Sequence, residues 1–200
     1  TEQVLGLDLV EWQVRIASGE ELTLRQEEVH ARGHAVECRI YAEDPYQNFV
    51  PSVGALVRWV PPSGPGLRLD SGVAQGQEIS THYDPMLAKL IAWGPDRPSS
   101  MRRMELALSQ FPVLGLVTNI PFLRQVVRCP RFQEGDYDTG FLTGDSGVTR
   151  PELSQEAQNL AQALAAWAAQ GIPGPGPTPQ AGPAEAQSNP WRTAGKLRLP

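Results

Sequence analysis

The clearest pattern in the sequence is an alternation of side chains over residues 34–42. Successive side chains of an extended strand point to opposite faces. One face would carry the mainly apolar set His34, Val36, Cys38, Ile40 and Ala42. The other would carry Ala35, Glu37, Arg39 and Tyr41. We predict a strand here that ends at Pro45, because proline cannot donate to a sheet ladder.

Helical and extended patterns alternate along the rest of residues 1–142. Asp8 and Glu11 resemble a capping box for a short helix that Gly19 closes. Residues 20–33 read as a loop, and residues 53–93 as short strands separated by turns. The last of these strands, residues 86–93, is almost wholly apolar except for Lys89.

A second helix is predicted after Asp96, which can cap it. Its apolar stripe has helical spacing and indicates core packing; it consists of Met101, Met104, Leu108 and Phe111. Residues 113–117 suggest a short buried strand, and Thr118 or Asn119 can cap a helix that stops before Pro130. We read residues 132–142 as a loop. The spacing of the several short strands over residues 53–93 suggests an antiparallel sheet.

The composition changes towards the C-terminus. Residues 151–170 are rich in alanine and predict a helix, and residues 171–189 are rich in proline and glycine, as in a flexible linker. Apolar and aromatic residues return after 190. The expected organisation is a domain at 1–145, a helical extension at 146–170, the linker, and the start of a truncated following domain at 190–200. Because the chain starts without methionine in the middle of a pattern, we expect a piece of a longer protein.

Charge and composition argue against several classes of protein. The net charge of -5 offers no electrostatic reason to bind nucleic acid or an anionic membrane. No run of eighteen apolar residues and no signal peptide are present, so we expect neither a membrane span nor secretion. Cys38 and Cys129 are too far apart in sequence to suggest a zinc motif or a disulfide framework, and a reducing compartment fits them.

Self-contained catalytic motifs are missing from the sequence. It holds no phosphate-binding glycine loop, no HExxH and no GxSxG. The three histidines, His30, His34 and His82, share no ligand spacing, so no metal site is expected.

Arg39 is the strongest candidate for chemistry. Its guanidinium stays protonated and needs an anion or rich hydrogen bonding nearby. Glu37, on the same face, can supply a plain ion pair; alternatively Arg39 belongs to a site for a carboxylate, bicarbonate, phosphate or developing enolate. Simpler roles suit the other polar residues: a local backbone bond for Asp84, pairing or an edge position for Lys89, and a surface pair for Arg68 and Asp70.

Four stretches give the sequence a family resemblance: TEQVLGLDLVEWQVRIASGE, GHAVECRIYAEDP, HYDPMLAKLIAWG and GLVTNIPFL. In this order and spacing, over residues 1–143, they resemble the C-terminal part of the biotin carboxylase domain of biotin-dependent carboxylases. The resemblance is best to the α subunit of acyl-CoA carboxylases, especially the methylcrotonoyl-CoA type.

The resemblance implies an α+β fold, an antiparallel sheet with flanking helices. It also implies an ATP-grasp enzyme that uses MgATP and bicarbonate to form carboxyphosphate and then carboxylates biotin. The implied partners are a biotin carrier domain outside this chain and a carboxyltransferase β subunit. Arg39 takes the place of the family arginine that contacts biotin and stabilises its enolate, with Glu37 as its orienting neighbour. Thr139, in YDTGFL, is the candidate for the adenine side of the nucleotide.

The family's catalytic base, metal-binding carboxylates and nucleotide lid would precede residue 1, so we expect the chain to be inactive alone. The implied location is the cytoplasm for a bacterial protein or the mitochondrial matrix for a eukaryotic one. Two alternatives remain: a non-catalytic interaction module that keeps this fold, or the equivalent part of a propionyl-CoA, acetyl-CoA or pyruvate carboxylase.

Overall fold

The computed structural model of the chain describes residues 1–142, 148, 152 and 154–169. The chain divides into two compact units, Thr1–Pro151 and Glu152–Pro200. The second unit contains helix α6, Gln155–Ala169, which begins four residues later than the alanine-rich pattern. The predicted linker at 171–189 and the segment after it lie outside the described residues. Within the part that is described, no helix is long and apolar enough to cross a membrane.

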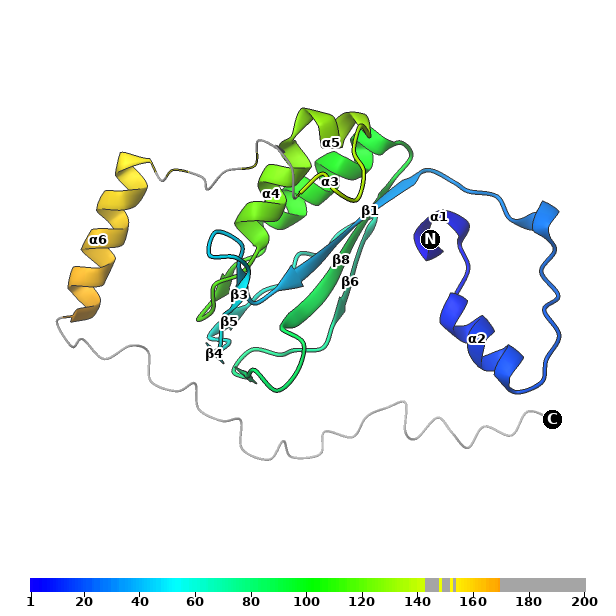
Figure 1. Cartoon of the computed structure of the whole chain (residues 1–200), viewed down its shortest axis with the longest axis horizontal. Helices are drawn as coiled ribbons and strands as arrows, with labels where there is room; N and C mark the ends of the chain where they lie inside the picture. The colour runs from blue at the N-terminus through cyan, green and yellow to red at the C-terminus, as the bar shows by residue number, and fades with distance from the viewer. Residues whose placement is uncertain (143–147, 149–151, 153, 170–200) are drawn as a thin grey trace, which may run out of the picture. The chain divides into compact units, whose positions relative to one another are not determined.

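Three antiparallel strands form the central sheet of the first unit, in the order β1–β8–β6 (Figure 1). Strand β1 is His34–Tyr41, β6 is Leu67–Ser71 and β8 is Met86–Gly94. The predicted alternation is confirmed: Val36, Cys38 and Ile40 are buried, whereas Glu37 and Arg39 are exposed. The ladder of β1 with β8 is regular up to Ile40, and its register shifts between Ile40 and Tyr41.

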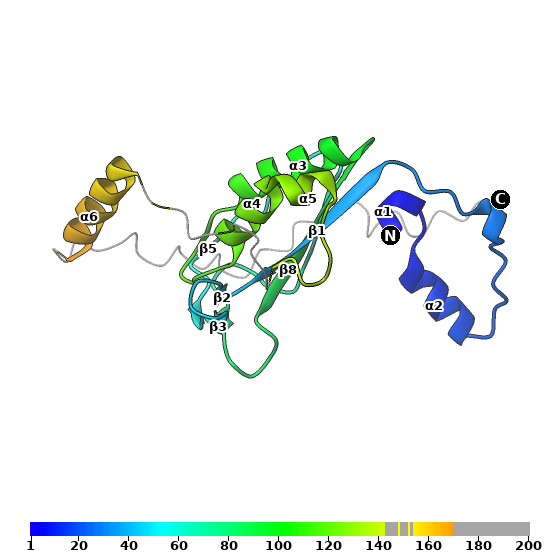
Figure 2. The same ribbon diagram turned by 45° about the horizontal axis from the view of Figure 1, so that its top comes forward.

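Three helices cover one face of this sheet (Figures 1 and 2). They are α3, Arg97–Ser109; α4, Ile120–Arg128; and α5, Pro130–Glu134. The predicted stripe of α3 lies in the core, where Met104 is fully buried against the sheet residues Ile40 and Leu90 of the same apolar cluster. Asp96 caps α3 as predicted, since its carboxylate accepts a hydrogen bond from the Ser99 amide at 2.7 Å. The helical side of the sheet is therefore the buried side.

Short two-stranded ladders extend from the central sheet. They pair β2, Glu43–Asp44, with β3, Val50–Pro51; β4, Gly54–Ala55, with β7, Glu78–Ile79; and β5, Arg58–Trp59, with β9, Val113–Leu114. All three pairs are antiparallel, which confirms the predicted sheet type.

The N-terminal segment begins with two helices, α1, Glu2–Leu5, and α2, Leu9–Ala17. Asp8 caps α2 as predicted by accepting a hydrogen bond from the Glu11 amide at 2.9 Å. The predicted loop before β1 contains one turn of 3-10 helix, η1, Gln26–Glu28. A backbone hydrogen bond from Arg32 to the Val4 carbonyl, 2.7 Å long, joins α1 to the approach of β1.

Helix α5 contradicts the predicted loop at residues 132–134. Pro130 ends one helix and also begins the next, because proline is well suited to the first turn, where its missing N–H is not needed. Arg97 of α3 holds the new helix in place: its Nε donates to the Gln133 carbonyl at 2.9 Å, and its guanidinium also donates to the Phe132 carbonyl. These partners are more than thirty residues apart in sequence, so local pattern does not reveal them.

Gly33 provides a direct test of the packing at the start of β1. Its φ is +69°, and a Cβ at this position would lie 2.8 Å from the Trp93 ring and too close to the Gly94 carbonyl. Gly33→Ala is therefore expected to lower the free energy of unfolding by roughly 2 kcal/mol or more, from the left-handed backbone and the clash together. Urea denaturation measures this. Gly72→Ala is the matched control, because no atom lies within 4 Å of its Cβ position. Equal stabilities of the two variants would contradict the account.

Candidate functional site

The open face of the sheet presents Arg39 beside Glu37. The Arg39 side chain is 62% exposed, and its Nε lies 3.3 Å from Glu37 Oε1. The Glu37 carboxylate and then the Tyr41 side chain raise the pKa of the Arg39 guanidinium. The ion pair that the sequence suggested is thus present. It engages one edge of an exposed guanidinium that has five N–H donors, so the pair is compatible with a second anionic partner.

A second cation faces Arg39 across the strand pair. In the register of the sheet Arg39 is opposite Lys89 of β8, and Lys89 is opposite Asp70 of β6. Lys89 is ion-paired, with its Nζ 3.3 Å from Asp70 Oδ2. Because β8 is the central strand, Lys89 does not occupy a sheet edge. Like charges directly opposite each other repel. The Arg39–Lys89 pair across the two strands therefore favours an anion nearby.

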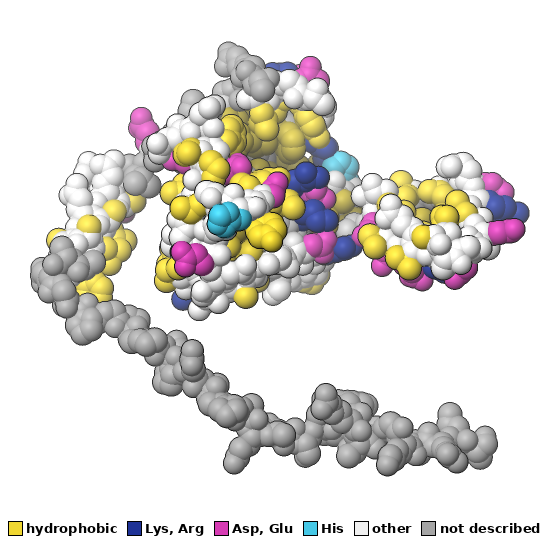
Figure 3. Space-filling view, turned by 60° about the horizontal axis from the view of Figure 1, so that its bottom comes forward, with side chains coloured by type: hydrophobic (Ala, Val, Ile, Leu, Met, Phe, Trp, Pro, Cys, Tyr) yellow, Lys and Arg dark blue, Asp and Glu magenta, His cyan; other side chains and the backbone are white. Residues whose placement is uncertain are grey.

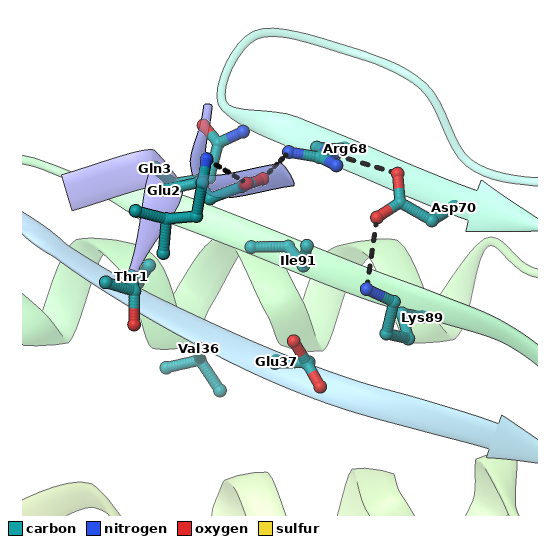
Figure 4. Close-up of a pocket in the computed structure, with 11 residues that line it drawn as sticks. Thr1, Glu2, Gln3, Val36, Glu37, Arg68, Asp70, Lys89 and Ile91 are labelled. Atoms are coloured by element: carbon teal, nitrogen blue, oxygen red, sulfur yellow. Dashed lines mark hydrogen bonds and ion pairs between the residues drawn. The ribbon is translucent and has the colours of Figure 1, made fainter. Parts of the chain in front are cut away.

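The ion pairs continue from Asp70 to the N-terminal helix (Figure 4). Arg68 Nε lies 2.8 Å from Asp70 Oδ1, and Arg68 Nη1 lies 2.6 Å from Glu2 Oε2. Arg68 lowers the pKa of both carboxyl groups through these hydrogen bonds. The predicted Arg68–Asp70 pair is confirmed, but Glu2 was not expected, since it is distant in sequence. This series of ion pairs links α1 to β6 and β8.

A pocket of about 230 Å³ lies between α1 and the sheet, lined in part by Glu2, Glu37, Arg68 and Lys89. Figure 4 shows Glu2, Arg68 and Lys89 joined in a row through Asp70, with Glu37 of β1 apart from this row. Figure 3 shows basic and acidic side chains side by side on one face of the sheet unit, with hydrophobic side chains around them. Arg39 stands beside this pocket, next to Glu37 and opposite Lys89.

The backbone that carries Arg39 is held from the helical layer by Asn119, a polar residue that is 7% exposed. Asn119 lies at the N-cap position of α4, as predicted, but its side chain makes no cap hydrogen bond. Its Oδ1 instead accepts from the Tyr41 amide at 2.9 Å, and its Nδ2 donates to the Arg39 carbonyl at 3.0 Å. The sequence pattern therefore placed Asn119 correctly at the start of α4 but predicted the wrong hydrogen-bond partner for its side chain.

The opposite face of β1 places Cys38 in the core. The thiol is 6% exposed, and burial, followed by the nearby Glu37 charge, raises its pKa to about 12. A thiolate is the nucleophilic form of cysteine, so Cys38 is unsuited to nucleophilic chemistry.

Thr139 is exposed in a turn, where the Gly140 amide donates to Asp138 Oδ1 at 2.9 Å. It is not among the residues that line the pocket beside Arg39. Asp84 makes the predicted local bond, accepting from the Met86 amide at 2.8 Å. Within the described ranges, no group of three or more His, Cys, Asp or Glu residues is arranged to hold a metal ion.

Comparison with known proteins decides the family. The sequence profile of the family described as "Biotin carboxylase C-terminal domain" matches residues 37–144, more than half of the chain. The chain belongs to the biotin carboxylase C-terminal domain family. The match begins at Glu37 and includes Arg39, Lys89 and Asn119. The resemblance and the α+β fold with an antiparallel sheet are thereby confirmed.

Individual relatives agree with this family. The chain is 48% identical over 143 residues to the mitochondrial methylcrotonoyl-CoA carboxylase subunit alpha of Rattus norvegicus, covering 71% of this chain and 20% of that protein. It is 43% identical over 169 residues to the mitochondrial propionyl-CoA carboxylase alpha chain of Sus scrofa, covering 82% and 23% respectively.

A solved relative is the biotin carboxylase domain of the Hydrogenobacter thermophilus 2-oxoglutarate carboxylase, in complex with MgADP, ADP and bicarbonate. It matches with a TM-score of 0.73 and 37% identity, over 76% of this chain and 34% of that one. The chain therefore spans about a fifth of the length of the two curated relatives and about a third of the solved domain.

The buried thiol gives a test of the two faces of β1. In the folded chain a disulfide reagent is expected to modify the half-buried Cys129 first and Cys38 only after unfolding, because Cys38 lacks both access and thiolate. The rates are measured by absorbance at mildly alkaline pH with and without guanidinium. Cys129→Ser isolates Cys38, and rapid modification of Cys38 in that folded variant would show that the face assignment is wrong.

Proposed function

We propose that the chain is the C-terminal part of the biotin carboxylase component of an acyl-CoA carboxylase α subunit. In the complete subunit this component carboxylates carrier-bound biotin with bicarbonate, driven by ATP. The observation that carries the proposal is Arg39, a permanent cation on the open face of the sheet, within the segment that matches the family. Other residues of the active site are assigned to a part of the complete subunit outside this chain.

Arg39 would act on the developing charge of biotin. When the ureido group of biotin loses the proton on N1, negative charge gathers on its carbonyl oxygen, and a fixed cation aimed at that oxygen stabilises the charge as CO2 is transferred. Glu37, 3.3 Å from Arg39 Nε, would hold the guanidinium in orientation. The opposed Lys89 favours anionic charge at the same row of the sheet.

MgATP and bicarbonate are the proposed co-substrates of the complete subunit. A biotin carrier domain and a carboxyltransferase β subunit are its proposed partners. Helix α2 supports a longer protein: its apolar residues Val10, Val14 and Ile16 are 63%, 64% and 48% exposed. Such a surface is suited to contact with another part of the same subunit. Thr139 remains a proposal for the adenine side, supported by its resemblance to the family segment alone.

Methylcrotonoyl-CoA is the acyl-CoA we favour, because the identity to that subunit is 48%, against 43% for the propionyl-CoA subunit. The acyl-CoA reacts on the carboxyltransferase, so residues outside this chain would select it. Both of these mammalian relatives are described as mitochondrial. For this chain we propose the mitochondrial matrix in a eukaryote and the cytoplasm in a bacterium.

Replacing Arg39 tests the proposed function. In a complete subunit that contains this segment, Arg39→Met should lower the rate of carboxylation of free biotin by roughly 10²- to 10³-fold, because an electrostatic stabiliser of the enolate is lost. The rate is measured as phosphate released from ATP in the presence of biotin and bicarbonate. Arg102→Met, which removes an exposed arginine of α3 on the helical side, is the control and should retain the wild-type rate.

Unchanged turnover in Arg39→Met would overturn this role. A complete wild-type subunit that carboxylates no biotin would favour instead an interaction module that keeps the fold of the family without its chemistry.

A further inference from the structure

Strand β1 is an edge strand of the central sheet, because within the described residues β8 alone pairs with it along its length. The outward-pointing backbone groups of an edge strand normally bond to water or remain open to another chain. At Arg39 and Tyr41 they bond to Asn119 instead. The Tyr41 amide donates to Asn119 Oδ1 at 2.9 Å, Asn119 Nδ2 donates to the Arg39 carbonyl at 3.0 Å, and the Asn119 amide donates to the Tyr41 carbonyl at 3.2 Å.

These three hydrogen bonds make Asn119 a one-residue replacement for a neighbouring strand. Its carboxamide presents an oxygen acceptor and an N–H donor side by side, which match an N–H and a C=O of the β1 edge. The bonds cross about eighty positions of sequence, and Asn119 is 7% exposed, so the contact is fixed by tertiary packing and shielded from water.

The contact lies where the ladder on the other side of β1 is irregular. The register with β8 is regular at Arg39 and Ile40 and shifts between Ile40 and Tyr41, where Leu87 of β8 is the extra residue. A bulge weakens pairing and re-aims the side chains beside it. The β8 ladder therefore pairs Arg39 regularly but constrains the backbone less at Tyr41, and the bonds to Asn119 hold the backbone there from the free edge.

We propose that Asn119 is a positioning residue that sets the direction of the Arg39 guanidinium by holding the β1 backbone at the Arg39 carbonyl and at Tyr41, two residues further on. This inference rests on the proposed function, in which Arg39 stabilises the enolate of biotin. The role requires both ends of the carboxamide. Asn119→Asp keeps an acceptor for the Tyr41 amide, but it loses the donor and places a carboxylate against the Arg39 carbonyl.

Hydrogen exchange of the full chain tests the contact itself. In Asn119→Ala the Tyr41 amide should exchange at least about ten-fold faster than in the wild type, because its acceptor is gone and the edge opens. Ser100→Ala is the matched control: its hydroxyl is fully buried and bonds to the Arg97 carbonyl and to His34, near the other end of β1. Equal exchange of Tyr41 in the two variants would overturn the proposed contact.

Kinetics of the complete subunit test the positioning role. A displacement of about 1 Å at a reacting group can cost on the order of 10²-fold in rate. We therefore expect Asn119→Ala and Asn119→Asp to lower kcat/KM for free biotin by roughly 10- to 100-fold, with KM for ATP and bicarbonate within about twofold of wild type. Ser100→Ala should leave kcat/KM for biotin unchanged.

The double variant Arg39→Met/Asn119→Ala separates the two claims. If Asn119 acts through Arg39, the double variant should be no slower than Arg39→Met alone, because the group being positioned is already absent. Additive losses, or wild-type kcat/KM in both Asn119 variants, would overturn the positioning role while leaving the proposed function intact. Full activity of Arg39→Met would instead remove the proposed function, on which this inference depends.

Discussion

The pairing of β1 with β8 is the constraint on which the rest of the structure depends. Side chains alternate along a strand, so a shift of one residue in register would move Arg39 to the core and Ile40 to the surface. Burial of Ile40 and Leu90 against α3 fixes the register, since an unpaired guanidinium in that core would be strongly unfavourable. The apolar face thus determines where the charged face points.

On the charged face of the sheet, each cation lies near both another cation and a carboxylate. Arg39 and Lys89 oppose each other, Glu37 and Asp70 attract one each, and Arg68 extends the ion pairs to α1. Exposed ion pairs contribute little to stability. Their consequence here is geometric: they hold the cations at defined positions on an open surface.

Sequence pattern predicted most of the local structure, and family resemblance predicted the fold. The alternation in β1, the Asp8 and Asp96 caps and the α3 stripe are local, so they follow from the spacing of a few residues. Sequence pattern failed where the partners are distant in sequence. It assigned Asn119 to a helix cap and did not reveal Glu2 as the partner of Arg68. It also predicted a loop where Arg97 holds helix α5 in place. The role proposed for Arg39 came from resemblance, because the sequence of a single strand does not distinguish an ion pair from a ligand site.

The position of biotin in the complete subunit tests the central claim most directly. A crystal structure of that subunit with biotin and bicarbonate should place a terminal nitrogen of the Arg39 guanidinium about 3 Å from the ureido oxygen of biotin, with Glu37 still beside Nε. Biotin bound away from the open face of β1, with Arg39 contacting only Glu37, would contradict the account.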